Sequence, residues 1–79
     1  MRDPNRIDEF CNKLRIYWRG YFPDYRFGQF MMNFLGWIQS EKGDPFFPEE
    51  NKMLEYLKEY SEKYSPYHIY KENNNEINS

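Results

Sequence analysis

The apolar pattern is most regular between Pro23 and Ile38, in the run PDYRFGQFMMNFLGWI. Its apolar side chains recur at alternating three- and four-residue spacing, which is the period of one face of an α-helix. Asp24 is suited to begin this helix, because its side chain can accept amide hydrogens of the first turn. Gly43 is suited to end it. The pattern therefore predicts a helix over residues 25–42, with a core face formed by Phe27, Phe30, Met31, Phe34, Leu35 and Ile38.

Two further apolar residues, Met32 and Trp37, widen this stripe beyond half of the helix circumference. A helix of that kind is usually covered on two sides, so we expect it to be the central helix of the fold. Gly28 and Gly36 lie inside it, and each costs up to about 1 kcal/mol relative to Ala. A second helix crossing closely at one of these glycines would explain that cost.

A second amphipathic segment precedes the central helix and predicts a helix over residues 4–20. Asp3 and Pro4 form a suitable start, because Pro4 occupies a position that needs no hydrogen-bond donor. Gly20 is the expected end. The apolar stripe of this helix consists of Ile7, Phe10, Cys11, Leu14, Tyr17, Trp18 and Tyr21.

The segment from Asp44 to Pro48 cannot be regular helix, because its two prolines restrict the residues before them to extended conformations. We expect an irregular loop that packs Phe46, Phe47 or both against the core. A third helix over residues 48–64 follows, with one apolar stripe and one charged, solvated face. The stripe consists of Met53, Leu54, Leu57, Tyr60, Ser61 and Tyr64.

These elements predict an all-α fold, a compact three-helix domain over residues 1–66. The remaining residues, 67–79, contain an asparagine run and few apolar side chains, which is typical of a flexible, disordered polar tail.

The chain has 79 residues with seven Phe, eight Tyr and two Trp. A domain of this size buries only about 60% of its unfolded surface, so aromatic packing or self-association must supply much of its stability. Cys11 is the only cysteine and cannot form an internal disulfide. Its position on an apolar stripe predicts a reduced, buried thiol, with a free reactive thiol as the less favoured alternative.

The net charge of −2 argues against a general nucleic-acid binder that is held by phosphate neutralisation. No apolar run has the length of a membrane span, and the first residues lack the apolar core of a signal peptide. We therefore expect a cytoplasmic protein that makes no contact with membranes.

Catalytic and metal-binding constellations are absent from the pattern. His68 is the only histidine and has no second ligand at metal-binding spacing. The paired glutamates of the third helix are typical of a solvated face, and no glycine-rich phosphate loop is present. We expect no enzyme activity, no cofactor and no small-molecule substrate.

Basic residues alternate with aromatic ones around the end of the first helix, where Lys13, Arg15, Arg19 and Arg26 stand among tyrosines and Trp18. This alternation is found in sites that stack single-stranded nucleic acid. The same aromatics also fall on the stripe that the core requires, and Arg26 can equally pair with an acidic residue of another helix. Nucleic-acid binding by this face remains an alternative function.

Protein binding is the first hypothesis, because aromatic residues and arginine dominate interface energetics and the chain has more of them than three short helices can cover. A protein partner or self-association would use this surplus. The candidate partner-binding residues are Arg15, Arg19, Tyr21, Tyr25, Arg26, Trp37, Phe46 and Phe47.

Several short motifs carry a family resemblance: Arg2-Asp3-Pro4 with Arg6-Ile7, then Trp18, Pro23 to Phe30, and Gly43 to Phe46. Together they resemble an uncharacterised family of small Firmicutes and phage proteins, and the spacing within residues 18–30 is distantly similar to the YihD family of small helical bacterial proteins. The resemblance covers residues 2–62. It implies a compact helical domain in a bacterial host cell and a phage or mobile-element origin, which suggests an inhibitor of host defence. It transfers no catalytic residue.

Overall fold

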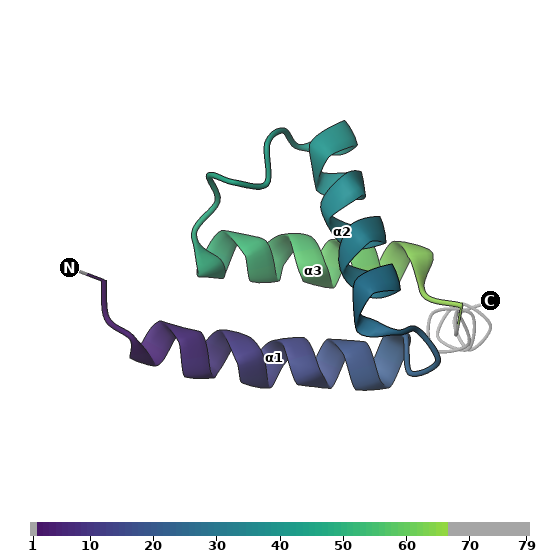
Figure 1. Ribbon diagram of the computed structural model, residues 1–79, viewed down its shortest axis with the longest axis horizontal. Coiled ribbons are helices and arrows are strands. Elements are labelled where there is room, and N and C mark those ends of the chain that lie inside the picture. Colours follow the sequence, from purple (N-terminus) through teal and green to yellow (C-terminus); the bar gives the residue numbers. More distant parts are fainter. Residues whose placement is uncertain (1, 67–79) are drawn as a thin grey trace, which may run out of the picture.

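The computed structural model describes residues 2–66, which form three helices joined by short connections (Figure 1). Helix α1 spans Asn5–Tyr21, α2 spans Phe27–Glu41 and α3 spans Glu50–Tyr64. The predicted all-α, three-helix fold is confirmed, and the predicted helix bounds agree with the observed ones within two residues. The predicted tail, residues 67–79, lies outside the described residues.

Helices α1 and α3 lie side by side and run in the same direction, although α2 separates them in sequence (Figure 1). Helix α2 rises steeply from the end of α1 and crosses α3, and the loop after it leads back to the start of α3. Because the two helices run in parallel, their amino-terminal ends lie next to each other, and so do their carboxy-terminal ends.

Ion pairs join the amino-terminal ends of α1 and α3. The guanidinium of Arg2 donates from Nε and Nη2 to the two carboxylate oxygens of Glu49, at 2.8 and 2.6 Å. Arg6 Nε donates to Glu50 Oε1 at 2.7 Å. The hydrogen bond from Arg2 lowers the pKa of Glu49, and the pKa of Arg2 is raised in turn. Arg2 and Glu49 are exposed, so their forked geometry fixes the register of the two helices more than it stabilises them.

A buried hydrogen bond joins the opposite ends of the same helices. Ser65 is 2% exposed, and its Oγ donates to the backbone oxygen of Tyr21 at 2.7 Å. The carbonyl groups of the last turn of a helix have no partner within the helix, so a side-chain donor from another element satisfies one of them. The parallel pair is therefore tied at both ends.

The core lies where α2 meets the other two helices. Phe30 and Phe34 are fully or almost fully buried, and the ring of Phe30 lies 5.0 Å from that of Phe22. Tyr60 of α3 joins the cluster through its ring contacts with Phe22 and Phe34, at 5.5 and 5.4 Å. The buried apolar set consists of Phe22, Phe30, Phe34, Trp37, Ile38, Leu57 and Tyr60.

The predicted core face of α2 is only partly correct. Phe30, Phe34 and Ile38 are buried as predicted, but Phe27 and Leu35 are 56% and 36% exposed. Because α2 crosses its neighbours steeply, it contacts them along one narrow arc rather than on two sides. The prediction of a doubly covered central helix was therefore wrong. Instead, α3 packs against both other helices.

Two predicted helix ends also differ. Gly20 lies inside α1, which continues to Tyr21. Helix α2 begins at Phe27 with Arg26 in the capping position, so Asp24 lies in the connecting turn. Gly43 does follow α2 with a φ of 122°, and its N–H donates to Ile38 O at 2.8 Å, as expected of a terminating glycine.

The two glycines inside α2 do not mark a close helix crossing. A Cβ atom built at Gly28 or at Gly36 would meet no atom within 4 Å apart from its chain neighbours and the backbone of its own helix. Both glycines are exposed, so the crossing proposed from the sequence does not occur there.

Candidate functional site

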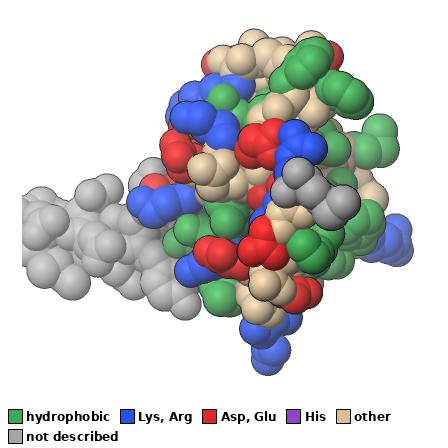
Figure 2. All heavy atoms as spheres, turned by 90° about the vertical axis from the view of Figure 1, so that its left-hand side faces the viewer, with side chains coloured by type: hydrophobic (Ala, Val, Ile, Leu, Met, Phe, Trp, Pro, Cys, Tyr) green, Lys and Arg blue, Asp and Glu red, His purple; other side chains and the backbone are tan. Residues whose placement is uncertain are grey.

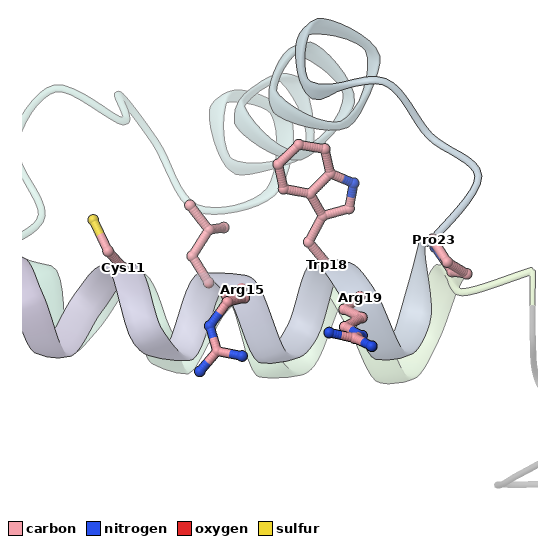
Figure 3. A pocket seen from close by; sticks show the side chains of 6 residues that line it. Cys11, Arg15, Trp18, Arg19 and Pro23 are labelled. Carbon is pink, nitrogen blue, oxygen red and sulfur yellow. The ribbon is translucent and has the colours of Figure 1, made fainter.

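An open groove of about 390 Å³ lies along the second half of α1, beside the connection to α2. We call it the α1 groove, and its lining residues are Cys11, Leu14, Arg15, Trp18, Arg19 and Pro23. Figure 3 shows that the side chain of Trp18 points from α1 towards α2 and that Cys11 leaves α1 on the same side, whereas the guanidinium of Arg15 is directed away from α2. Arg15 and Arg19 also line the groove, so it has an apolar floor and a basic rim along its outer edge.

The floor depends on the packing of Trp18. Its indole Nε1 donates to the backbone oxygen of Tyr25 at 3.0 Å, which fixes the ring against the connection between α1 and α2. Its ring lies 5.7 Å from that of Phe27 and 5.8 Å from that of Phe30. Trp18 therefore connects the buried core with the floor of the α1 groove, and the exposed ring of Phe27 adds apolar surface beside it.

The basic rim consists of Arg15 and Arg19, which are both exposed and one helical turn apart. Neither makes an ion pair with another residue in the range 2–66. The two guanidinium groups can therefore bind carboxylate or phosphate groups of a partner without giving up a partner within the described residues.

Cys11 is exposed at one end of the groove, which corrects the prediction of a buried thiol. None of the residues of α1 is buried, because its stripe is only partly covered by the rest of the fold. Ile7, one turn before Cys11, is 49% exposed.

A second candidate site is the loop after α2, residues 44–48, which we call the phenylalanine loop. Phe46 and Phe47 are 82% and 73% exposed, so the prediction that they pack against the core was wrong. Asp44 shapes the loop, because its Oδ1 accepts the N–H of Phe46 at 2.9 Å and its carbonyl accepts that of Phe47 at 3.4 Å. The two rings contact each other edge to face at 5.1 Å. The loop thus presents a preformed aromatic pair to solvent.

The other candidate residues from the sequence have structural environments. Trp37 is only 9% exposed and belongs to the core. Tyr21 and Tyr25 are half-buried and pack against that core. Arg26 is exposed, and its backbone oxygen accepts the N–H of Phe30 at the start of α2. The fold therefore brings Arg15 and Arg19 together in one groove and Phe46 and Phe47 together in one loop, whereas Tyr21, Tyr25 and Trp37 lie in or against the core.

The side chain of Lys42 packs over the aromatic rings near the end of α2. Lys42 Nζ lies over the rings of Trp37 and Tyr56, at 5.4 and 5.6 Å from their centroids, and pairs with Glu59 at 3.0 Å. This cation–π contact covers part of the cluster and links α2 to α3. The pKa of Tyr60, which belongs to the same cluster, is raised mainly by burial and to a smaller extent by the nearby Tyr25 and Tyr64.

Figure 2 shows how the exposed side chains are distributed on one face. Hydrophobic side chains gather at the top and along the right-hand margin, while basic and acidic groups are mixed over the rest. Leu14 and Pro23, which line the α1 groove, were not among the candidates from the sequence, and Trp18 was named only with the basic and aromatic residues of the alternative nucleic-acid face. The signal for Leu14 and Trp18 was the apolar stripe of the first helix, which does not reveal where a neighbouring element stops covering it.

Within residues 2–66, no group of three or more His, Cys, Asp and Glu side chains is placed to hold a metal ion. His68 lies outside the described residues. None of the helices in the described part of the chain combines the length and the apolar character needed to cross a membrane.

Comparison with known proteins gives no relative: no protein family, curated protein or solved structure matches the chain. A functional interpretation therefore depends on the α1 groove and the phenylalanine loop.

Proposed function

We propose that the chain is a non-enzymatic protein that binds a host protein and modulates it, with the phenylalanine loop as its principal anchor. The observation that carries this proposal is the exposure of Phe46 and Phe47 in a loop shaped by Asp44. Aromatic side chains, phenylalanine among them, are enriched in the cores of protein interfaces. Each can bury on the order of 150–250 Å², and in this loop that area faces water.

The shape of the loop favours binding over a role in folding. The loop backbone is already restricted by prolines at positions 45 and 48 and by the turn that Asp44 forms. Binding to a partner would therefore cost little additional conformational entropy. Two adjacent rings that hold each other edge to face can enter one apolar pocket together. This arrangement supports a preformed anchor.

The resemblance to phage proteins is the basis for proposing that the partner is a bacterial host protein, that the chain acts in the cytoplasm, and that the outcome is inhibition of host defence. Nucleic-acid binding by the α1 groove is the alternative function, supported by Arg15 and Arg19, which make no ion pair within residues 2–66. It is less well supported, because Phe27 and Phe30 pack against the ring of Trp18 and leave it a poor stacking platform for bases.

The proposal is tested by affinity capture from extracts of Firmicutes cells with the wild-type chain and with Phe46→Ala plus Phe47→Ala. A captured protein is then purified and titrated against both chains. Hot-spot truncation typically costs 2 kcal/mol or more, so the double variant should bind at least about 30-fold more weakly.

Met32→Ala is the matched control, because Met32 is 78% exposed on α2, away from the loop. It should bind like the wild type, and all three chains should melt within a few degrees of one another. Equal affinity of the double variant and the wild type for the captured protein would refute the loop as the anchor.

A further inference from the structure

The α1 groove has a composition that selects one kind of partner segment. We propose that it binds an acidic amphipathic helix of a partner protein, with apolar side chains on its floor and carboxylates on Arg15 and Arg19. This inference rests on the proposed function, since it assigns a second contact to the same protein-binding role.

The floor is suited to apolar side chains. Leu14, Trp18 and Pro23 line it, and the only polar group of the Trp18 side chain is already bonded to Tyr25. A volume of about 390 Å³ is sufficient for two or three side chains of an incoming segment. The groove is open along α1, which suits an extended element such as a helix better than a small compact ligand (Figure 3).

The rim selects for negative charge. Arg15 and Arg19 are four residues apart, which places them about 6 Å apart along the helix axis. Carboxylates four residues apart on a partner helix have the same spacing, so one such pair can reach both guanidinium groups. Because neither arginine has an ion-pair partner within residues 2–66, the complementary charge can come from outside the domain.

A second copy of this chain is a poorer occupant. The carboxylates of α3 already pair with cations of their own chain: Glu50 with Arg6, Glu55 with Lys52, Glu59 with Lys42 and Glu62 with Lys58. Binding through this acidic helix would break those pairs. The charge complementarity therefore favours a different protein as the source of the acidic helix.

Single-stranded nucleic acid also carries negative charge, but it needs a stacking surface and a longer basic track. The rings of Phe27 and Phe30 pack against Trp18, and the chain has a net charge of −2. Apolar area beside only two rim cations fits an amphipathic peptide better than a phosphate backbone.

The test uses synthetic helical peptides of about 16 residues, with leucines at i, i+3 and i+7 and two glutamates four residues apart beside them. Binding to the full chain is measured by titration calorimetry. We expect the glutamate peptide to bind about tenfold more tightly than the same peptide with glutamines, and the difference to shrink with added salt. Arg15→Glu plus Arg19→Glu should abolish the preference, and a peptide with arginines in place of the glutamates should restore binding to that variant.

Lys13→Glu plus Lys63→Glu is the matched control, since it changes the net charge equally at two exposed lysines outside the groove. It should retain the wild-type preference. Equal binding of glutamate and glutamine peptides would overturn the proposal, as would absence of binding at peptide concentrations up to about 1 mM. Tighter binding of oligothymidine than of the glutamate peptide would overturn it in favour of nucleic acid.

The outcome is separable from that of the proposed function. If the peptides do not bind but capture of a host protein still depends on the phenylalanine loop, only the proposal of an acidic helix in the α1 groove is refuted. If the peptides bind but changes in the phenylalanine loop do not affect capture, the loop is refuted as the anchor and the proposal for the groove stands.

Discussion

Replacing Phe30 by alanine tests the core most directly, because this side chain connects two helices and the segment between them. It is 0% exposed, and its ring lies 5.8 Å from Trp18 of α1, 5.0 Å from Phe22 and 6.3 Å from Phe34 of α2. Truncation would leave a cavity bounded by rigid rings, which collapse poorly into the space.

Phe→Ala substitutions in cores cost about 3–5 kcal/mol, and the surrounding aromatic contacts place Phe30 in the upper part of that range. A chain of 79 residues has a total stability of roughly 4–12 kcal/mol at typical values per residue. Phe30→Ala should therefore remove a large part of the free energy of unfolding. Phe30→Leu, which fills part of the space, should cost about 1–2 kcal/mol and keep the chain measurable.

The assay is urea denaturation followed by far-UV circular dichroism, with Phe46→Ala as the matched control. Phe46 is 82% exposed, so its truncation should change the free energy of unfolding by less than about 0.5 kcal/mol. A cost below about 1 kcal/mol for Phe30→Ala at an unchanged denaturant slope would refute the described core. So would a Phe46→Ala variant as unstable as Phe30→Ala.

Two other predictions concern the glycines and the buried tyrosine. Gly43→Ala should cost about 1 kcal/mol or more because its φ is 122°, whereas Gly36→Ala, in open space inside α2, should stabilise the chain by up to about 1 kcal/mol. Thermal melts that rank the two variants in the opposite order would contradict this. Burial raises the pKa of Tyr60 above its ordinary value of 10.0, so its stabilising contribution is complete below that pH and is lost as the pH rises through the higher pKa of the folded chain. Tyr60→Phe should therefore match the wild type at pH 7 and unfold at higher pH during alkaline titration; coincident alkaline transitions would show that Tyr60 does not drive them.

Helical periodicity was sufficient to predict the three helices and the inner half of the core. Phe30, Phe34 and Ile38 follow the period and are buried. Phe27 and Leu35 follow the same period, yet the steep crossing of α2 leaves them partly in water. Local pattern specifies which side chains share a face, whereas the crossing angle decides how much of that face is covered.

The candidate sites were less predictable for a related reason. Arg15 and Arg19 were identified as candidates from their residue types, but the apolar floor beside them also includes Pro23 from the connection to α2, which only the folded chain places there. Phe46 and Phe47 were expected to be buried because they are apolar, and the turn formed by Asp44 turns them outward instead. Neither the parallel pairing of α1 with α3 nor the contact of Arg2 with Glu49 has a signature in local sequence, because both depend on residues more than 40 positions apart.

The parallel arrangement of α1 and α3 has a consequence for the order in which the chain can fold during synthesis. Helices α1 and α2 leave the ribosome first, but the surfaces they bury are completed by Leu57 and Tyr60 of α3. Until α3 emerges, Phe34 and Trp37 of α2 lack their contacts with Tyr60, and the long separation between the paired ends delays closure. The nascent chain therefore stays dependent on its last helix, and a product that stops before Leu57 would expose those aromatic side chains to aggregation.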